Sequence, residues 1–248
     1  MKIPIIEYVS EFRTRLLYLL ISFLINFFLC FFYIEYLIYI LIYPYSKLSN
    51  LIGKHFIYTN LFEVFLSYLW LSFVIGLILT LPLLFYHVYQ FFHPALYNNE
   101  KIFIKKFFIL SILFFYIGMI FGYYYLISNI WNFSISFEDI IPNMPFYLEP
   151  KIYDYLKLVL KIITATGISF QIPIYILLYV NKYKLNHIWL KKKRKFFFVL
   201  SFLIGAVLSP PDLFSQILIA VPLIIFYEFI IYYYCFKYFW IKFGDDRV

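Results

Sequence analysis

The sequence has little of the chemistry on which soluble enzymes depend. Only 14% of its 248 residues are charged, and only 7 are glycine. The two cysteines, Cys30 and Cys235, both lie in apolar stretches. Free buried thiols are the ordinary case there, so neither a disulfide nor a metal site is indicated. The four histidines are scattered, and HExxH, GxSxG and P-loop motifs are absent. We therefore expect no enzyme, no cofactor and no metal centre.

Apolar side chains dominate the sequence instead. Hydrophobic residues make up 65% of the chain, and the mean hydropathy is +0.85. Continuous apolar stretches of about 20 residues predict transmembrane helices. The fifth and sixth helices are expected to be short, and the fifth would cover only about 20 Å of a hydrocarbon core about 30 Å thick. We expect one all-α polytopic membrane domain over 1–248, with spans at about 16–39, 64–85, 107–127, 158–180, 196–208 and 213–236.

The net charge of +8 is distributed as membrane topology requires, and this argues against nucleic-acid binding. Basic residues lie in the short segments between apolar spans, and six spans put both termini on one side. That side includes the seven basic residues from Lys182 to Lys195. The positive-inside rule therefore predicts both termini in the cytoplasm or in the equivalent mitochondrial matrix. The opposite side and its margins hold only Lys47, Lys54, Lys151, Lys157 and Lys161.

The stretch 91–106 is the longest break in apolar character in the first half of the chain. It contains one carboxylate, Glu100, among three lysines. A carboxylate just outside a membrane span can meet an incoming cation. Alternatively, it can pair with Lys101 or Lys105 across a helical turn.

A second carboxylate, Glu11, has the same two interpretations. It stands four residues before Arg15, the spacing of a helical ion pair. If the amino-terminal segment packs near the first inner loop, Glu11 and Glu100 together could hold two guanidinium groups by charge-assisted bonds.

Polar side chains in or beside the later spans need partners. Gln171 and Gln216 either bond between packed helices or contact another membrane helix or a ligand. Glu228 is either functional or close enough to the inner interface to stay hydrated. Asp212, which follows Pro210 and Pro211, is expected to cap the next helix after a rigid turn.

Several runs occur in one order along the chain. They are EFRTRL from Glu11, EVF from Glu63, FFHPALYNNE from Phe91, FFYIGM from Phe114, SFQIP from Ser169 and SPPDLFSQ from Ser209, together with Pro44 and Glu228. With their six-span arrangement, these runs resemble the TatC family, the signal-peptide receptor of the twin-arginine protein translocase. Each run alone is weak evidence, and their combination is specific.

The resemblance implies a binding and transport function. TatC-like proteins bind the twin-arginine motif of signal peptides on the inner face. With single-span TatA/TatB-like subunits and further TatC copies, they move folded proteins across the membrane lipid, driven by the proton motive force. By this resemblance, the signal peptide would contact Glu11, Glu100, Arg13, Phe91, Pro94 and Lys101. The outer loops and partner helices would involve Pro44, Glu63, Gln171, Asp212, Gln216 and Glu228.

The sequence also departs from the family pattern. Gln171 stands where the family has an intramembrane Glu, which keeps hydrogen bonding but argues against a role that needs protonation. The chain is rich in residues with AT-rich codons, with 33 Phe and 27 Tyr. This bias suggests an organelle-encoded member of the mitochondrial inner membrane, with a bacterial plasma membrane as the alternative. Two other functions stay open, a solute or proton transporter using Glu228, Gln171 and Asp212, and a structural subunit of a respiratory complex.

Overall fold

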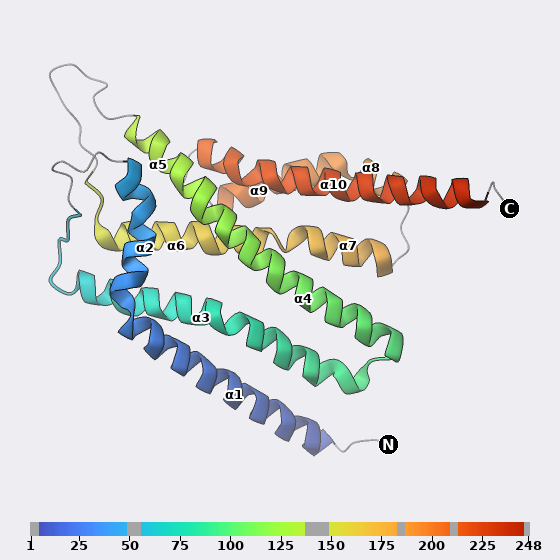
Figure 1. The fold of residues 1–248 in the computed structure, drawn as a ribbon, viewed down its shortest axis with the longest axis horizontal. Helices are drawn as coiled ribbons and strands as arrows, with labels where there is room; N and C mark the ends of the chain where they lie inside the picture. Colours follow the sequence, from blue (N-terminus) through green and yellow to red (C-terminus); the bar gives the residue numbers. More distant parts are fainter. Residues whose placement is uncertain (1–4, 49–55, 137–148, 183–186, 209–212, 246–248) are drawn as a thin grey trace. The chain divides into compact units, whose positions relative to one another are not determined.

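The computed structural model describes residues 5–48, 56–136, 149–182, 187–208 and 213–245, and it confirms the all-α class (Figure 1). Among these residues the only β-type pairing is an isolated bridge between Ile57 and Lys151. The helices are α1 (Ile5–Phe32), α2 (Ile34–Leu48), α3 (Glu63–Phe92), η1 (His93–Ala95), α4 (Asn98–Phe121), the π-helical turn η2 (Gly122–Ile127), α5 (Ser128–Ile135), α6 (Ile152–Ser169), α7 (Ile172–Lys182), α8 (His187–Lys192), α9 (Arg194–Leu208) and α10 (Leu213–Asp245).

The chain forms two compact units. The first comprises 1–113 and 131–160, and the second comprises 114–130 and 161–248. In the first unit α1 lies alongside α3, as Figure 1 shows. Phe23 of α1 meets Phe73 of α3 edge to face at 5.4 Å between ring centroids. A Cβ at Gly76 would lie 3.3 Å from the backbone of Phe27, so the absence of a side chain there lets the two helices approach closely.

An aromatic cluster lies at one end of the first unit. Tyr45 contacts Phe56, Trp131 and Tyr155, with ring centroids 5.2 to 5.8 Å apart. The Tyr155 hydroxyl donates to the Leu41 carbonyl at 2.8 Å, so the buried phenol is satisfied. Pro44 lies inside α2 and immediately precedes Tyr45 of this cluster. The predicted first span ends at about residue 39, whereas α2 continues through Pro44 to Leu48 because neighbouring rings bury this segment.

In the second unit, small residues let α4 and η2 approach α6. A Cβ at Gly118 would lie 2.8 Å from the Thr166 carbonyl oxygen and from the ring of Phe170. A Cβ at Gly122 would lie 2.2 Å from the Thr166 hydroxyl oxygen. That hydroxyl donates instead to the carbonyl of Ile162 or Ile163 in its own helix, at 2.9 Å in each case. Close helix contact through glycine is the usual packing mode in membranes.

The core around α7 to α10 is aromatic and aliphatic. Phe197 of α9 stacks on Tyr227 of α10 with ring centroids 4.1 Å apart. The Tyr227 hydroxyl donates to the Leu190 carbonyl at 2.8 Å, and the Tyr234 hydroxyl donates to Asn181 Oδ1 at 2.8 Å. These bonds join α10 to α8 and α7 while burying both rings. Near the opposite end of α9, a Cβ at Gly205 would lie 2.7 Å from the backbone oxygen of Gln216 in α10.

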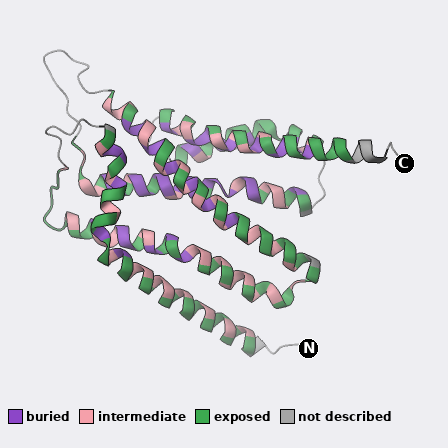
Figure 2. Cartoon of the chain, viewed as in Figure 1, coloured by how far each residue is buried: buried purple, intermediate pink, exposed green. Residues whose placement is uncertain are grey.

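Five helical stretches of the described residues are long and apolar enough to cross a membrane, namely Glu7–Phe32, Glu63–Ala95, Glu100–Ile135, Ile152–Asn181 and Leu213–Trp240. Only 6% of the apolar window in the first stretch is buried, against 56% in the fourth, so α1 needs lipid or another helix to cover it (Figure 2). The predicted fifth span corresponds to α9, which has 15 residues. The chain is thus an integral membrane protein of helical type.

Several boundaries differ from the predicted spans. The first span divides at Tyr33, between α1 and α2. The polar stretch 91–106 is mostly helical, because α3 extends to Phe92 and α4 begins at Asn98. The prediction of a short sixth helix is wrong, since α10 has 33 residues. The helix continues past the predicted end at residue 236 through Lys237, Tyr238, Phe239 and Trp240, which are exposed, so burial does not account for the extension.

Candidate functional site

Glu11 lies near the start of α1, and Arg15 holds its carboxylate from one turn further along. Arg15 Nε donates to Glu11 Oε1 at 2.9 Å, and Arg15 Nη2 donates to the same oxygen. The interpretation of Glu11 as an ion pair with its basic neighbour is therefore confirmed. The Glu11 side chain is nevertheless 37% exposed, against 19% for Arg15. A carboxylate with bonds on one oxygen keeps acceptor capacity on the other for an incoming donor.

Glu100 lies in the first turn of α4 and caps that helix. Its Oε2 accepts a hydrogen bond from the backbone N–H of Tyr97 at 3.1 Å. The backbone N–H groups of Glu100 and Lys101 donate in turn to the Tyr97 carbonyl, at 2.9 and 3.0 Å. This is one half of a capping box, and the carboxylate also gains from the positive end of the helix dipole. Among the described residues no lysine pairs with Glu100, so neither predicted lysine pairing is formed.

An aromatic contact connects α1 to the end of α3. Phe12, which follows Glu11, meets Phe91 edge to face at 5.8 Å between ring centroids. Pro94 is the second residue of η1, which follows α3 directly, and it is exposed. The structure thus brings the first turns of α1 to the end of α3, from which only a short connection leads to Glu100. Four of the predicted site residues carry charge, namely Glu11, Glu100, Arg13 and Lys101. Within the described residues, no hydrogen bond or ion pair links any two of these four side chains.

Glu63 lies at the first residue of α3 and fastens the segment before it. Its Oε2 accepts from the backbone N–H of Thr59 at 2.8 Å, from that of Asn60 at 3.2 Å, and from the Thr59 hydroxyl at 3.2 Å. A groove of about 330 Å³ adjoins this carboxylate and is also lined by Lys151 and Asp154. Sequence reasoning did not connect these last two to Glu63. The Ile57–Lys151 bridge brings them together, and no local pattern predicts it.

The polar residues of the later spans have definite positions. Gln216 Nε2 donates to the Phe202 carbonyl at 3.0 Å, which supports the interpretation as a contact between packed helices. Gln171 is 8% exposed and lies in the break between α6 and α7. Pro173 explains this break, since it has no N–H to continue the bonding of α6. Asp212, with its proposed capping role, lies outside the described residues.

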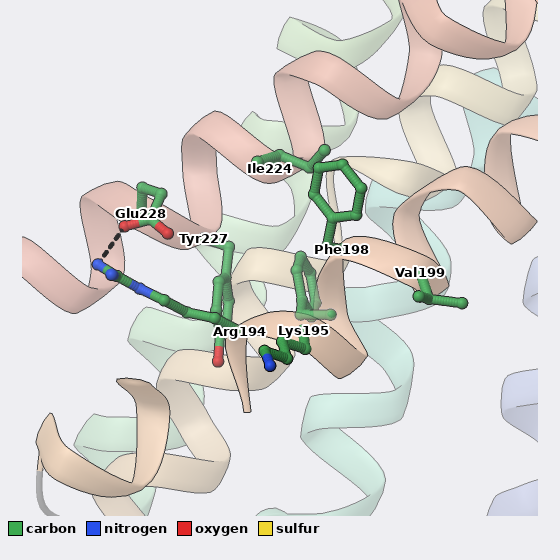
Figure 3. A pocket seen from close by; sticks show the side chains of 8 residues that line it. Arg194, Lys195, Phe198, Val199, Ile224, Tyr227 and Glu228 are labelled. Atoms are coloured by element: carbon green, nitrogen blue, oxygen red, sulfur yellow. Dashed lines mark hydrogen bonds and ion pairs between the residues drawn. The ribbon is translucent and has the colours of Figure 1, made fainter. Parts of the chain in front are cut away.

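Glu228 lies midway along α10 and has a cationic partner that sequence reasoning missed. Arg194 Nη2, from the first residue of α9, donates to Glu228 Oε2 at 2.6 Å (Figure 3). Their side chains are 43% and 34% exposed, respectively. The sequence assigned Arg194 only to the basic run before α9, and 34 residues separate the two. The pair is therefore a tertiary contact that helix packing alone creates.

Comparison with known proteins agrees with these features. The family model for the Sec-independent protein translocase protein (TatC) matches residues 7–222. The chain is 37% identical over 223 residues to the Sec-independent protein translocase protein TatC of Rickettsia prowazekii, covering 90% of this chain and 88% of that protein. It is 35% identical over 228 residues to the tatC-like protein ymf16 of Reclinomonas americana, covering 91% and 85%.

A solved structure shares the fold. The crystal structure of the twin-arginine translocase receptor TatC in DDM superposes with a TM-score of 0.72 at 30% identity, covering 92% of this chain and 99% of that one. Among the relatives, the ymf16 proteins support the expected mitochondrial inner membrane, and the bacterial proteins agree with the plasma-membrane alternative. The chain belongs to the TatC family of Sec-independent protein translocase proteins.

Proposed function

We propose that this protein is the receptor for twin-arginine signal peptides and the core of a translocase driven by the proton motive force. The observation that carries this proposal is the Phe12–Phe91 contact. It holds the Glu11 turn of α1 against the end of α3, from which η1 leads to Glu100 at the start of α4. Two carboxylates from different helices are thereby associated with one end of the first unit.

The chemistry of the two carboxylates suits paired guanidinium groups. A planar guanidinium donates two parallel hydrogen bonds to a carboxylate, which an ammonium group does not reproduce. Glu11 already accepts two bonds from the Arg15 guanidinium, both on Oε1, so its Oε2 keeps acceptor capacity for an arginine donor. Glu100 is exposed and is fixed by its bond to Tyr97. Phe91 and Pro94 would pack against the peptide, and Arg13 and Lys101 would shape the patch.

Docking of partner helices is proposed for the other predicted residues. Single-span TatA/TatB-like subunits or a second TatC copy would dock near Gln171, Gln216 and Glu228, while Pro44, Glu63 and Asp212 would support the outer loops. The mostly exposed apolar surface of α1 is compatible with a helical neighbour. A proton relay through Glu228 has less support, because Arg194 neutralises that carboxylate and Gln171 cannot ionise.

The experiment compares two photo-crosslinkable signal peptides on the reconstituted protein, one with Arg-Arg and one with Lys-Lys. Labelling at the Glu11 and Glu100 region with Arg-Arg alone is the expected result, since lysine keeps the charge and loses the guanidinium fork. Equal labelling by both peptides, or none, would overturn the receptor proposal and favour the respiratory-subunit interpretation. Copurification with redox subunits would strengthen that alternative.

A further inference from the structure

A groove in the second unit lies between α9 and α10 and has no role in the proposed peptide site. Its volume is about 370 Å³, and its lining includes Arg194, Lys195, Phe198, Val199, Ile224 and Glu228 (Figure 3). The charged residues lie at the first turn of α9 and midway along α10, and the apolar ones continue the groove along both helices. The groove therefore has one charged end and one apolar flank.

The charged end carries a positive excess. Arg194 and Lys195 are cationic, and Glu228 neutralises Arg194 through the bond from Nη2. In the part of the chain that the structure describes, no carboxylate pairs with Lys195, which is exposed. Three more exposed lysines, at 191–193, precede it in sequence but do not line the groove. The ligand that complements this end is an anion.

The apolar flank restricts the kind of anion. Phe198 and Val199 are 51% and 64% exposed, and they belong to a helix that packs within a membrane domain. Exposed apolar side chains on a helix of a membrane domain would face acyl chains, so the ligand that fits here offers hydrocarbon as well as negative charge. Inorganic phosphate and nucleic acid lack the hydrocarbon, and a neutral lipid lacks the net charge.

The short length of α9 places the charged end of the groove near the headgroup layer of the membrane. A helix of 15 residues spans only about 22 Å, less than a hydrocarbon core of roughly 30 Å. Arg194 and Lys195 occupy its first turn, so their heads lie within reach of the headgroup layer. Basic pockets between membrane helices are known to suit acidic headgroups.

We propose that the α9–α10 groove binds an anionic phospholipid of the surrounding membrane. Lys195 bonds the headgroup phosphate, with Arg194 as a second donor, and one acyl chain follows Phe198, Val199 and Ile224. The Glu228 carboxylate limits the positive charge of the site. This proposal is independent of the signal-peptide site, because it uses no residue of α1, α3 or α4.

The test titrates the purified full-length protein in detergent with dioleoyl phosphatidylglycerol or dioleoyl phosphatidylcholine and counts bound lipids by native mass spectrometry. The first phosphatidylglycerol is expected to bind more tightly than phosphatidylcholine. Lys195→Gln should weaken that first binding about fivefold, the effect of one basic group near an anionic headgroup. The matched control Lys191→Gln removes the same charge outside the groove and should change it less than twofold.

A second pair of variants tests the apolar flank without changing charge. Ile224→Trp fills the groove and should weaken the first phosphatidylglycerol binding, whereas Leu203→Trp on the exposed surface of α9 should not. Glu228→Gln should strengthen it, because Arg194 then becomes free to bond phosphate. Equal losses in Lys195→Gln and Lys191→Gln, an unchanged affinity in Ile224→Trp, or displacement of the lipid by inorganic phosphate would each overturn the proposal.

Discussion

Arg15 Nε donates to Glu11 Oε1 at 2.9 Å, one turn along α1. The carboxylate proposed to bind a signal-peptide arginine is therefore engaged by an arginine of its own helix. An incoming guanidinium must share this carboxylate or replace Arg15 on it. The internal pair thus competes with the peptide, and its removal should be detectable in the binding affinity.

The first prediction separates the two members of this pair. Glu11→Gln should weaken binding of an Arg-Arg signal peptide by at least about tenfold, since the bond to the guanidinium loses the charge of its acceptor. Arg15→Gln should leave that affinity unchanged or raise it severalfold, because the carboxylate becomes free. Fluorescence anisotropy with a labelled peptide and detergent-purified protein measures both. If Arg15→Gln weakens binding as much as Glu11→Gln, the carboxylate does not act by itself.

The second prediction concerns the capping bond of Glu100. Glutamine can still accept from the Tyr97 N–H, as in a capping box, whereas alanine cannot. Glu100→Ala should destabilise the start of α4 by about 1 kcal/mol and should also weaken peptide binding. Glu100→Gln should weaken peptide binding while keeping most of the stability.

Thermal unfolding in detergent and the same anisotropy titration distinguish these two effects. The variant Lys105→Gln is the control for a charge change on the same helix. Loss of peptide binding only in the alanine variant would mean that Glu100 acts through the fold and not through its charge.

The third prediction tests the fastening role of Glu63. Its carboxylate holds the backbone of Thr59 and Asn60, just after the Ile57–Lys151 bridge. Glu63→Ala should release this segment and speed tryptic cleavage after Lys151 severalfold, because proteolysis follows local opening. Glu63→Gln keeps an acceptor oxygen and should be cleaved at close to the wild-type rate. Mass spectrometry of timed digests gives the rates, and equal rates in all three proteins would contradict this role.

The fourth prediction concerns helix packing in the second unit. Gly118→Ala would place a Cβ 2.8 Å from the Thr166 carbonyl oxygen, which is backbone and cannot rotate away. We expect overpacking to cost about 1–3 kcal/mol and to lower the unfolding temperature. Gly76→Ala is the control, with its nearest contact at 3.3 Å, and should be milder. A similar unfolding temperature for both variants would show that the helices shift apart freely.

Local patterns predicted much of this protein, and long-range contacts account for what they missed. Apolar runs located the membrane helices, and the spacing of Glu11 and Arg15 predicted their ion pair. Helix ends were harder, because Tyr45 is buried by distant segments and α2 extends beyond the predicted first span. The helix α10 also runs past residue 236, where Lys237 to Trp240 are exposed and burial gives no explanation.

The candidate site also combines features that follow from local sequence with features that depend on long-range contacts. The capping of α4 by Glu100 follows from its position three residues after Tyr97, yet the competing lysine pairings have similar spacing. Sequence alone could not choose between them. The Arg194–Glu228 pair depends on how α9 packs against α10, and no periodicity predicts which turn faces which.

The spacing between α9 and α10 differs at their two ends. At Gly205 the backbone of α10 comes within contact of the position a Cβ would take, whereas at Phe197 two stacked rings separate the helices. The helices therefore diverge like a wedge, with the ring pair as its spacer. The width of the α9–α10 groove is thus set by Phe197 and Tyr227. Replacing both rings with small side chains would let the helices approach and would close the proposed lipid site without changing any charge.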